Sequence, residues 1–313
     1  MLLNTLLGLA GEESVFLAEE SWQDLIDLPV TEEILQEELE PDACIEVKDM
    51  GWALHLCQPE PVWLFLTDRY SPRKIISANA GKWAGPSRQT VVADERTLFL
   101  ALTEYLSLSL AEELFCESCL FQSTPVHVEE RIERLVHLLQ PALWEGLHDS
   151  EQSDSDTAAA GSSPSKDASI LEICCGSGMA TQALLRLGLR PLSMDSDRCD
   201  LCQALKAGLL DPSRSFALDA KNLPQILPTR SFDAVLGFMV GLIDDFNWPL
   251  WRDILLQAAS LSRRMVLFTT YTQKEAALIA KAFENASWQG RVIDNRDSHG
   301  IYDQWAYMGL RPG

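Results

Sequence analysis

The sequence has no apolar run that approaches the ~18 consecutive residues a membrane-spanning helix needs, so it is not predicted to cross a membrane. Its apolar start, residues 1–13, has no basic stretch, which favours a short packed helix over a signal peptide. Positive charge is also scarce, with 25 Lys and Arg against 46 Asp and Glu in 313 residues. Since 47% of the residues are hydrophobic, the chain can form a sizeable core, and disorder throughout is excluded.

The scarcity of positive charge is confined to the first half of the chain. Residues 1–168 contain 31 Asp and Glu but 10 Lys and Arg, whereas residues 169–313 contain 15 of each kind. Because nucleic-acid binding needs basic side chains against the phosphates, the first half is not predicted to bind a duplex. Its acidity fits a basic protein partner, or solubility alone.

The eight cysteines occur without signs of a secretory context, which favours reduced thiols and a cytoplasmic location. Two pairs, Cys116 with Cys119 and Cys199 with Cys202, have the spacing of zinc ligands. The pairs lie far apart in the chain, and the second falls in a predicted helix, where such cysteines are ordinary small apolar residues. No bound metal is therefore predicted.

The patterning predicts two domains, an acidic α/β domain over residues 1–122 and a second domain over residues 123–313. A Ser-, Asp- and Ala-rich stretch, residues 149–168, is expected to be a flexible linker or loop inside the second domain. In the first domain the apolar periodicity predicts strands at Trp52–Cys57, Val62–Asp68 and Lys74–Ala78, and a long helix at Thr97–Phe115.

From Ser169 onward, short apolar runs alternate with helical patterns. This alternation predicts a Rossmann-like, doubly wound, mostly parallel sheet. Only a short loop separates the last two predicted strands, Gly290–Ile293 and Trp305–Leu310, so they are expected to form an antiparallel hairpin at one edge.

The first strand of the second domain runs into a glycine-containing turn that opens a helix. Gly176 and Gly178 allow a tight turn and a close approach of the backbone to a ligand, which the free N–H groups of the helix would face. Asp195 follows the second strand, where a carboxylate can accept hydrogen bonds from both ribose hydroxyls. Because the acidic Glu172 lies in the first strand, a positively charged ligand is favoured over a pyrophosphate.

On these residues the sequence resembles the class I S-adenosylmethionine-dependent methyltransferases, over about Ser169 to Leu310. Residues 172–178 are similar to the family's acidic-x-Gly-x-Gly-x-Gly motif, with Cys174 in place of the first glycine. The loop over residues 173–181 is also similar to that of methyltransferases from methanogenic archaea. The resemblance implies that S-adenosylmethionine is bound, with Asp195 on the ribose and Asp219 on the adenine amino group. The cofactor-binding residues it implies are Glu172, Cys174, Gly176, Gly178, Asp195, Asp219, Ala220 and Gly237.

The resemblance implies in-line transfer of a methyl group to an acceptor. Three residues after the later strands are candidate catalytic groups: Asp244, Tyr271 and His299. The separate acidic domain favours a large acceptor with a basic surface, so a protein side chain is the leading prediction. A small-molecule acceptor, or a non-catalytic subunit that binds S-adenosylmethionine, are the alternatives. Nucleic acid is disfavoured by the acidity and by the absence of an Asn/Asp-Pro-Pro-aromatic signature.

Overall fold

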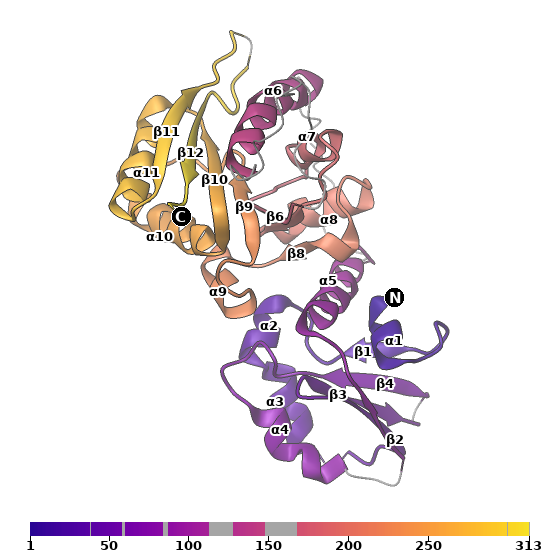
Figure 1. Ribbon diagram of the computed structural model, residues 1–313. Coiled ribbons are helices and arrows are strands. Elements are labelled where there is room, and N and C mark those ends of the chain that lie inside the picture. Colours follow the sequence, from indigo (N-terminus) through magenta and orange to yellow (C-terminus); the bar gives the residue numbers. More distant parts are fainter. Residues whose placement is uncertain are drawn as a thin grey trace, which may run out of the picture. The chain divides into compact units, whose positions relative to one another are not determined.

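The computed structural model describes residues 1–37, 39–57, 60–83, 87–112, 128–147, 168–298 and 300–312 (Figure 1). The chain divides into two compact units: residues 1–114 with 211–218, and residues 115–210 with 219–313. The predicted domain boundary at residue 122, and the predicted linker apart from Ala168, lie outside the described residues. Within the described ranges, no helix combines the length and apolar character that crossing a membrane requires.

The first unit contains a five-stranded mixed sheet in the described part of the chain. In spatial order its strands are β1 (Val15–Leu17), β4 (Val62–Leu66), β3 (Gly51–Leu56), β2 (Ala43–Val47) and β5 (Arg88–Val91). The three central strands pair antiparallel, while β1 and β5 run parallel to their neighbours. The helices of this unit are α1 (Leu2–Leu7), α2 (Trp22–Asp27), α3 (Pro29–Gln36), α4 (Ile75–Asn79), η1 (Ala80–Trp83) and α5 (Glu95–Glu112).

Most elements predicted in the first unit are confirmed, including the opening helix as α1 and the strands β3 and β4. The strand predicted at Lys74–Ala78 is wrong, because this segment forms α4. Asp68 Oδ2 accepts a hydrogen bond from Ile76 N at 2.9 Å, and the Lys74 ammonium donates to Asp68 O. The bond from Ile76 N satisfies a backbone donor in the first turn of α4, which has no partner within the helix.

The core of the first unit includes a cluster of aromatic rings around the fully buried Trp22. The ring centroids of Tyr70, Phe99 and Phe216 lie 5.1, 5.0 and 6.0 Å from that of Trp22. Phe216 comes from residues 211–218, and Ser107 Oγ of α5 donates a hydrogen bond to the neighbouring Ser215 O. The first unit is therefore built from two separate stretches of sequence.

A seven-stranded sheet confirms the Rossmann-like arrangement predicted for the second domain. In spatial order its strands are β11 (Gln289–Asp294), β12 (Trp305–Leu310), β10 (Ser262–Thr270), β9 (Phe232–Gly237), β6 (Ile170–Ile173), β7 (Leu192–Asp195) and β8 (Ser215–Ala217). Strands β7, β6, β9 and β10 run parallel. The antiparallel pairing of β12 with both β10 and β11 confirms the predicted C-terminal hairpin.

Helices pack on both faces of this sheet (Figure 1). Successive side chains of a strand point to opposite faces, so both faces carry apolar residues that the helices cover. Leu236 and Leu267 share an apolar core with α6 (Val128–Leu147) and α7 (Thr181–Arg186). The neighbouring Phe268 points the other way and packs on Phe283 of α11 (Gln273–Asn285), with ring centroids 5.6 Å apart. The remaining helical segments of this part of the chain are α8 (Arg198–Lys206), η4 (Pro212–Arg214), η5 (Ala220–Asn222), α9 (Leu223–Ile226) and α10 (Trp248–Ser260).

The strand order reverses at β6, whose carboxyl end is therefore the position at which this type of sheet binds ligands. The chain goes from β6 to β7 on one side and later returns to β9 on the other, and ligands of open α/β sheets bind at such a reversal. Ile173 pairs with Met194 in β7 and with Gly237 in β9, so the three strands end level with one another. The residues that follow each strand therefore meet at this edge.

Candidate cofactor and acceptor site

The loop between β6 and α7 has an unusual backbone. Cys174, Gly176 and Gly178 adopt φ values of +54°, +52° and +75°. Left-handed backbone costs a residue with a side chain about 1–2 kcal/mol, so the backbone of Cys174 is strained. Glycine, which the similar methyltransferase motif has at this position, would avoid the strain. At Gly178 a Cβ atom would lie 3.1 Å from two carbon atoms of Leu210, which leaves little space for a side chain. Glycine at positions 176 and 178 therefore lets the loop make this turn without that strain.

Glu172 lies fully buried beneath this loop, in β6. Its Oε2 accepts hydrogen bonds from Thr181 Oγ1 and Ser193 Oγ, both at 2.8 Å. Its other oxygen, Oε1, is buried and has no hydrogen-bond partner among the described residues. Burial raises the pKa of this carboxyl group to about 7, and the two hydroxyl donors offset only part of that effect. A donor or cation brought to Oε1 would therefore favour the carboxylate.

Asp195 at the end of β7 is tied to the glycine loop. Its Oδ2 accepts a hydrogen bond from Gly176 N at 2.7 Å, and its Oδ1 accepts one from Asp197 N at 2.8 Å. Asp197 itself caps α8, since its carboxylate accepts from Cys199 N and Asp200 N. Asp195 thus ends β7 and fixes the loop after β6, while its contact with a ribose stays a prediction.

Acidic side chains surround the loop on more than one side. Asp219 accepts a hydrogen bond from Lys221 N at 3.0 Å, is paired with the Lys221 ammonium at 3.1 Å, and precedes the buried Ala220. The pKa of the Cys174 thiol lies far above its ordinary range. Burial is the largest cause, and the negative charges of Asp195, Asp219 and Glu172 raise it further. The thiol therefore stays protonated at neutral pH and is no nucleophile, while the carboxylates favour a cationic ligand.

Gly237 ends β9 directly beside β6. A Cβ atom there would lie 2.6 Å from Val240 Cγ1, 3.1 Å from Phe268 Cδ1 and 3.2 Å from Ile173 Cγ1. Glycine is thus required by packing at this strand end, and any contact of this residue with a cofactor stays a prediction.

The three predicted catalytic residues have different surroundings. Tyr271 follows β10 with 37% of its surface exposed, and its ring centroid lies 6.3 Å from that of Tyr302. Asp244 accepts hydrogen bonds from Phe246 N and Asn247 N, both at 2.9 Å, just before α10. Its carboxylate is therefore engaged in the turn that leads into this helix. His299 lies outside the described residues.

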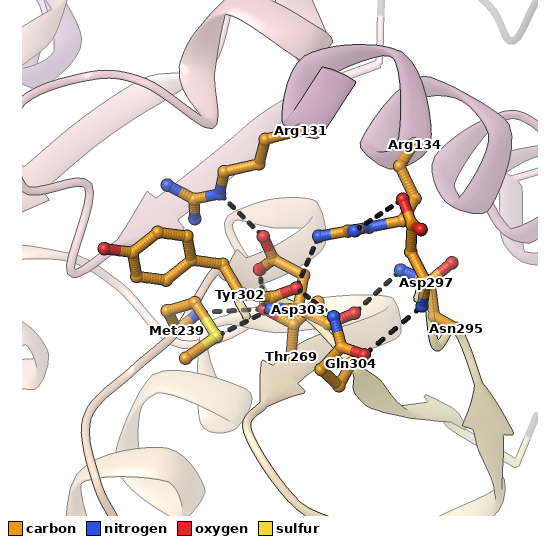
Figure 2. A network of polar contacts seen from close by, with 9 residues as sticks. All are labelled: Arg131, Arg134, Met239, Thr269, Asn295, Asp297, Tyr302, Asp303 and Gln304. Atoms are coloured by element: carbon orange, nitrogen blue, oxygen red, sulfur yellow. Dashed lines mark hydrogen bonds and ion pairs between the residues drawn. The ribbon is translucent and has the colours of Figure 1, made fainter. Parts of the chain in front are cut away.

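A buried ion pair next to Tyr302 was missed by the sequence analysis (Figure 2). Asp303 is fully buried; its Oδ2 accepts from Arg131 Nε at 2.7 Å and its Oδ1 from Thr269 Oγ1 at 2.5 Å. Asp303 N lies 2.9 Å from Met239 Sδ, and the Arg131 guanidinium lies 5.0 Å from the Tyr302 ring centroid. The network joins α6 to the carboxyl ends of β9 and β10.

Of the four paired cysteines, Cys116 and Cys119 lie outside the described residues. Cys199 and Cys202 lie in α8, and Cys202 is buried. Within the described ranges neither belongs to a group of three side chains that could hold a metal ion.

No protein-family model matches the chain, and no curated protein matches it by sequence. The magnesium protoporphyrin IX methyltransferase of Synechocystis PCC 6803, solved with bound SAM, is similar at 12% identity with a TM-score of 0.41, over 70% of this chain and 98% of that one. A SAM-dependent methyltransferase from Archaeoglobus fulgidus is similar at 12% identity and a TM-score of 0.40, over 59% and 94%. A chain from the complex of the Haloferax volcanii Trm112 methyltransferase activator with its methyltransferase partner is similar at 14% identity and a TM-score of 0.41, over 59% and 93%.

Proposed function

We propose that this chain is an S-adenosylmethionine-dependent methyltransferase. The observation that carries the proposal is the loop of residues 174–178, which has left-handed backbone at three residues, follows the buried Glu172 and is bound by the Asp195 carboxylate. The sequence motif that resembles class I methyltransferases thus lies at the strand-order reversal where this sheet type binds ligands.

The residues present fit this cofactor. Glu172 has a buried oxygen without a partner in the described part of the chain, and a carboxylate there suits a ligand with positive charge. Asp195 retains lone pairs on both oxygens for ribose hydroxyls, because a carboxylate can accept about four hydrogen bonds. Asp219 lies after β8, where the resemblance implies contact with the adenine. When bound, S-adenosylmethionine supplies a methyl group activated by a sulfonium.

The protein's part in the reaction is to position the acceptor and exclude water. Tyr271 and Tyr302 follow β10 and β11, and the Arg131–Asp303 pair fixes the loop that carries Tyr302. Tyr271 is exposed enough to meet an acceptor, so it is the better supported of the two described catalytic candidates. We propose that it helps to orient the acceptor, whereas Asp244 holds the loop ahead of α10.

Replacing Asp195 with alanine is expected to weaken S-adenosylmethionine binding about tenfold or more, or ~1.4 kcal/mol, because it removes a charged acceptor and the bond from Gly176 N. Calorimetric titration of both proteins measures this change. Asp253→Ala, which removes an exposed carboxylate of α10 that is paired with Arg252, is the control and should bind as the wild type does. Equal affinity of the Asp195→Ala protein would remove Asp195 from the site, and no binding by folded wild type would refute the proposed cofactor.

For the acceptor we propose a protein with a basic surface. The support is the charge of residues 1–168, in which Asp and Glu outnumber Lys and Arg by 31 to 10, and the presence of a separate compact unit that contains residues 1–114. Complementary charge would speed the encounter with such a partner and select it over acidic proteins.

We expect labelled methyl groups from S-adenosylmethionine to enter protease-sensitive material when the whole chain is incubated with cell extract. In a Glu20→Gln, Glu33→Gln, Glu37→Gln variant, which neutralises three exposed carboxylates, transfer should fall about threefold or more at low salt. Cofactor affinity should be unchanged in this variant. Label that appears in small molecules would favour the alternative acceptor class, and label in no fraction would favour a non-catalytic binding subunit.

A further inference from the structure

We propose that Asp42, His55 and Cys57 of the first unit form a binding site for a zinc-type transition-metal ion. The three side chains come together through strand pairing. Ala43 of β2 pairs with His55 of β3, and Asp42 N donates a hydrogen bond to His55 O at 3.2 Å. His55 and Cys57 are two residues apart in extended chain, so both project from the same face of the sheet.

The possible ligand atoms are already close together. His55 Nδ1 lies 2.6 Å from Asp42 Oδ1, and Cys57 Sγ lies 3.2 Å from Asp42 Oδ2. All three ligand atoms lie within 4.8 Å of one another, and the described ranges contain no other group of three metal-ligating side chains this close. Metal–ligand bonds of ~2.0–2.3 Å place tetrahedral ligands roughly 3.3–3.8 Å apart, so small side-chain rotations would admit an ion.

The donor set indicates which metal this site would bind. One carboxylate oxygen, one imidazole nitrogen and one sulfur suit Zn²⁺ and its neighbours, whereas Mg²⁺ and Ca²⁺ prefer oxygen alone. Three protein ligands leave a fourth position for water or another ligand. The Asp42 side chain is 54% exposed and that of His55 21%, so an ion can enter from solvent. The excess negative charge of residues 1–168 would also raise the local concentration of cations.

Neighbouring side chains restrict the orientation of the imidazole. The ring centroid of His55 lies 4.9 Å from that of Trp63, its cross-strand partner on β4. Trp63 is itself held by a hydrogen bond from its Nε1 to Glu13 Oε2 at 2.8 Å. Packing of this kind limits the rotation of the imidazole and so orients it as a ligand. The site does not depend on the proposed methyltransferase function, because none of its residues belongs to the proposed cofactor site.

The test is titration of the full-length, untagged, reduced protein with Co²⁺ and with Zn²⁺. Wild type should take up one equivalent of metal, and its cobalt form should show sulfur-to-cobalt charge-transfer absorption. Cys57→Ser should abolish that absorption, and His55→Ala should weaken metal binding about tenfold or more. Cys199→Ser, a cysteine substitution in the second unit, should leave both readings unchanged. Asp42→Asn preserves the shape of the side chain and should also weaken binding, which covers the case in which His55→Ala does not fold.

Two results would overturn the proposal. One is the absence of stoichiometric metal uptake by folded wild type. The other is a cobalt spectrum that persists in Cys57→Ser, which would place the sulfur ligand elsewhere. Neither result bears on S-adenosylmethionine binding, so the two proposals fail separately.

Discussion

Replacing Asp303 with asparagine is expected to lower the free energy of unfolding of the second unit by about 3 kcal/mol or more. Asparagine tolerates the +54° φ value of this residue, so the loss of stability measures the effect of removing the charge and not a strain in the backbone. The change leaves Arg131, which is largely buried, without its anion, and removal of one partner from a buried pair costs ~3–5 kcal/mol. Urea unfolding followed by circular dichroism measures the loss.

Asp294→Asn is the matched control for this prediction. Asp294 is an exposed residue of β11 paired with Arg296, and exposed pairs contribute about 0–1 kcal/mol. In a double-mutant cycle, Arg131→Met combined with Asp303→Asn should cost less than the sum of the single changes. Additive losses, or a loss at Asp303 no larger than that at Asp294, would contradict a stabilising role for the pair.

Glu172→Gln is expected to remove a large pH dependence of stability. Burial raises the folded-state pKa of Glu172 from 4.5 to about 7. As the pH rises, the Glu172 carboxyl group therefore loses its proton at a lower pH in the unfolded chain than in the folded protein. Glu172 therefore stabilises the fold most below pH ~4.5, and that contribution is lost as the pH rises to about 7. At ~1.4 kcal/mol per pKa unit the loss is about 3 kcal/mol, and the variant should lack it.

The measurement is the free energy of unfolding of both proteins between pH 4.5 and 8. Their difference should change by about 3 kcal/mol between pH 4.5 and about 7 and stay constant from there to pH 8. Glu284→Gln, an exposed substitution on α11, is the control and should follow the wild-type profile. A wild-type to Glu172→Gln difference that is independent of pH would show that the buried carboxyl group does not titrate in this range.

The sequence predicted the parts of the molecule that depend on local patterns. Apolar runs and glycine turns located the strands of the second sheet and the loop around Gly176 and Gly178. The prediction failed at Lys74–Ala78, where a side chain from residue 68 stabilises a helical turn that the apolar pattern does not show. Asp244 could have been recognised as a turn residue, because Pro249 in the first turn of α10 is a helix-start signal.

The parts that were missed are contacts between distant segments. Arg131 and Asp303 are 172 residues apart, and only the packing of α6 against the end of the sheet brings them together. Asp42 and His55 have no recognisable metal-ligand spacing, because their proximity comes from the register of β2 with β3. In both cases the chemistry is set by the fold.

The two-part construction of the first unit also has a consequence for biosynthesis. Phe216 and Ser215 complete a core whose other members include Trp22, Phe99 and Ser107, which are made much earlier. At about 5–20 residues per second, a ribosome needs roughly 5–20 s to proceed from residue 114 to residue 218. During that interval we expect the aromatic core to be incomplete, so that chaperones that bind apolar surface can recognise the nascent chain. No single cut in the chain can release this unit whole.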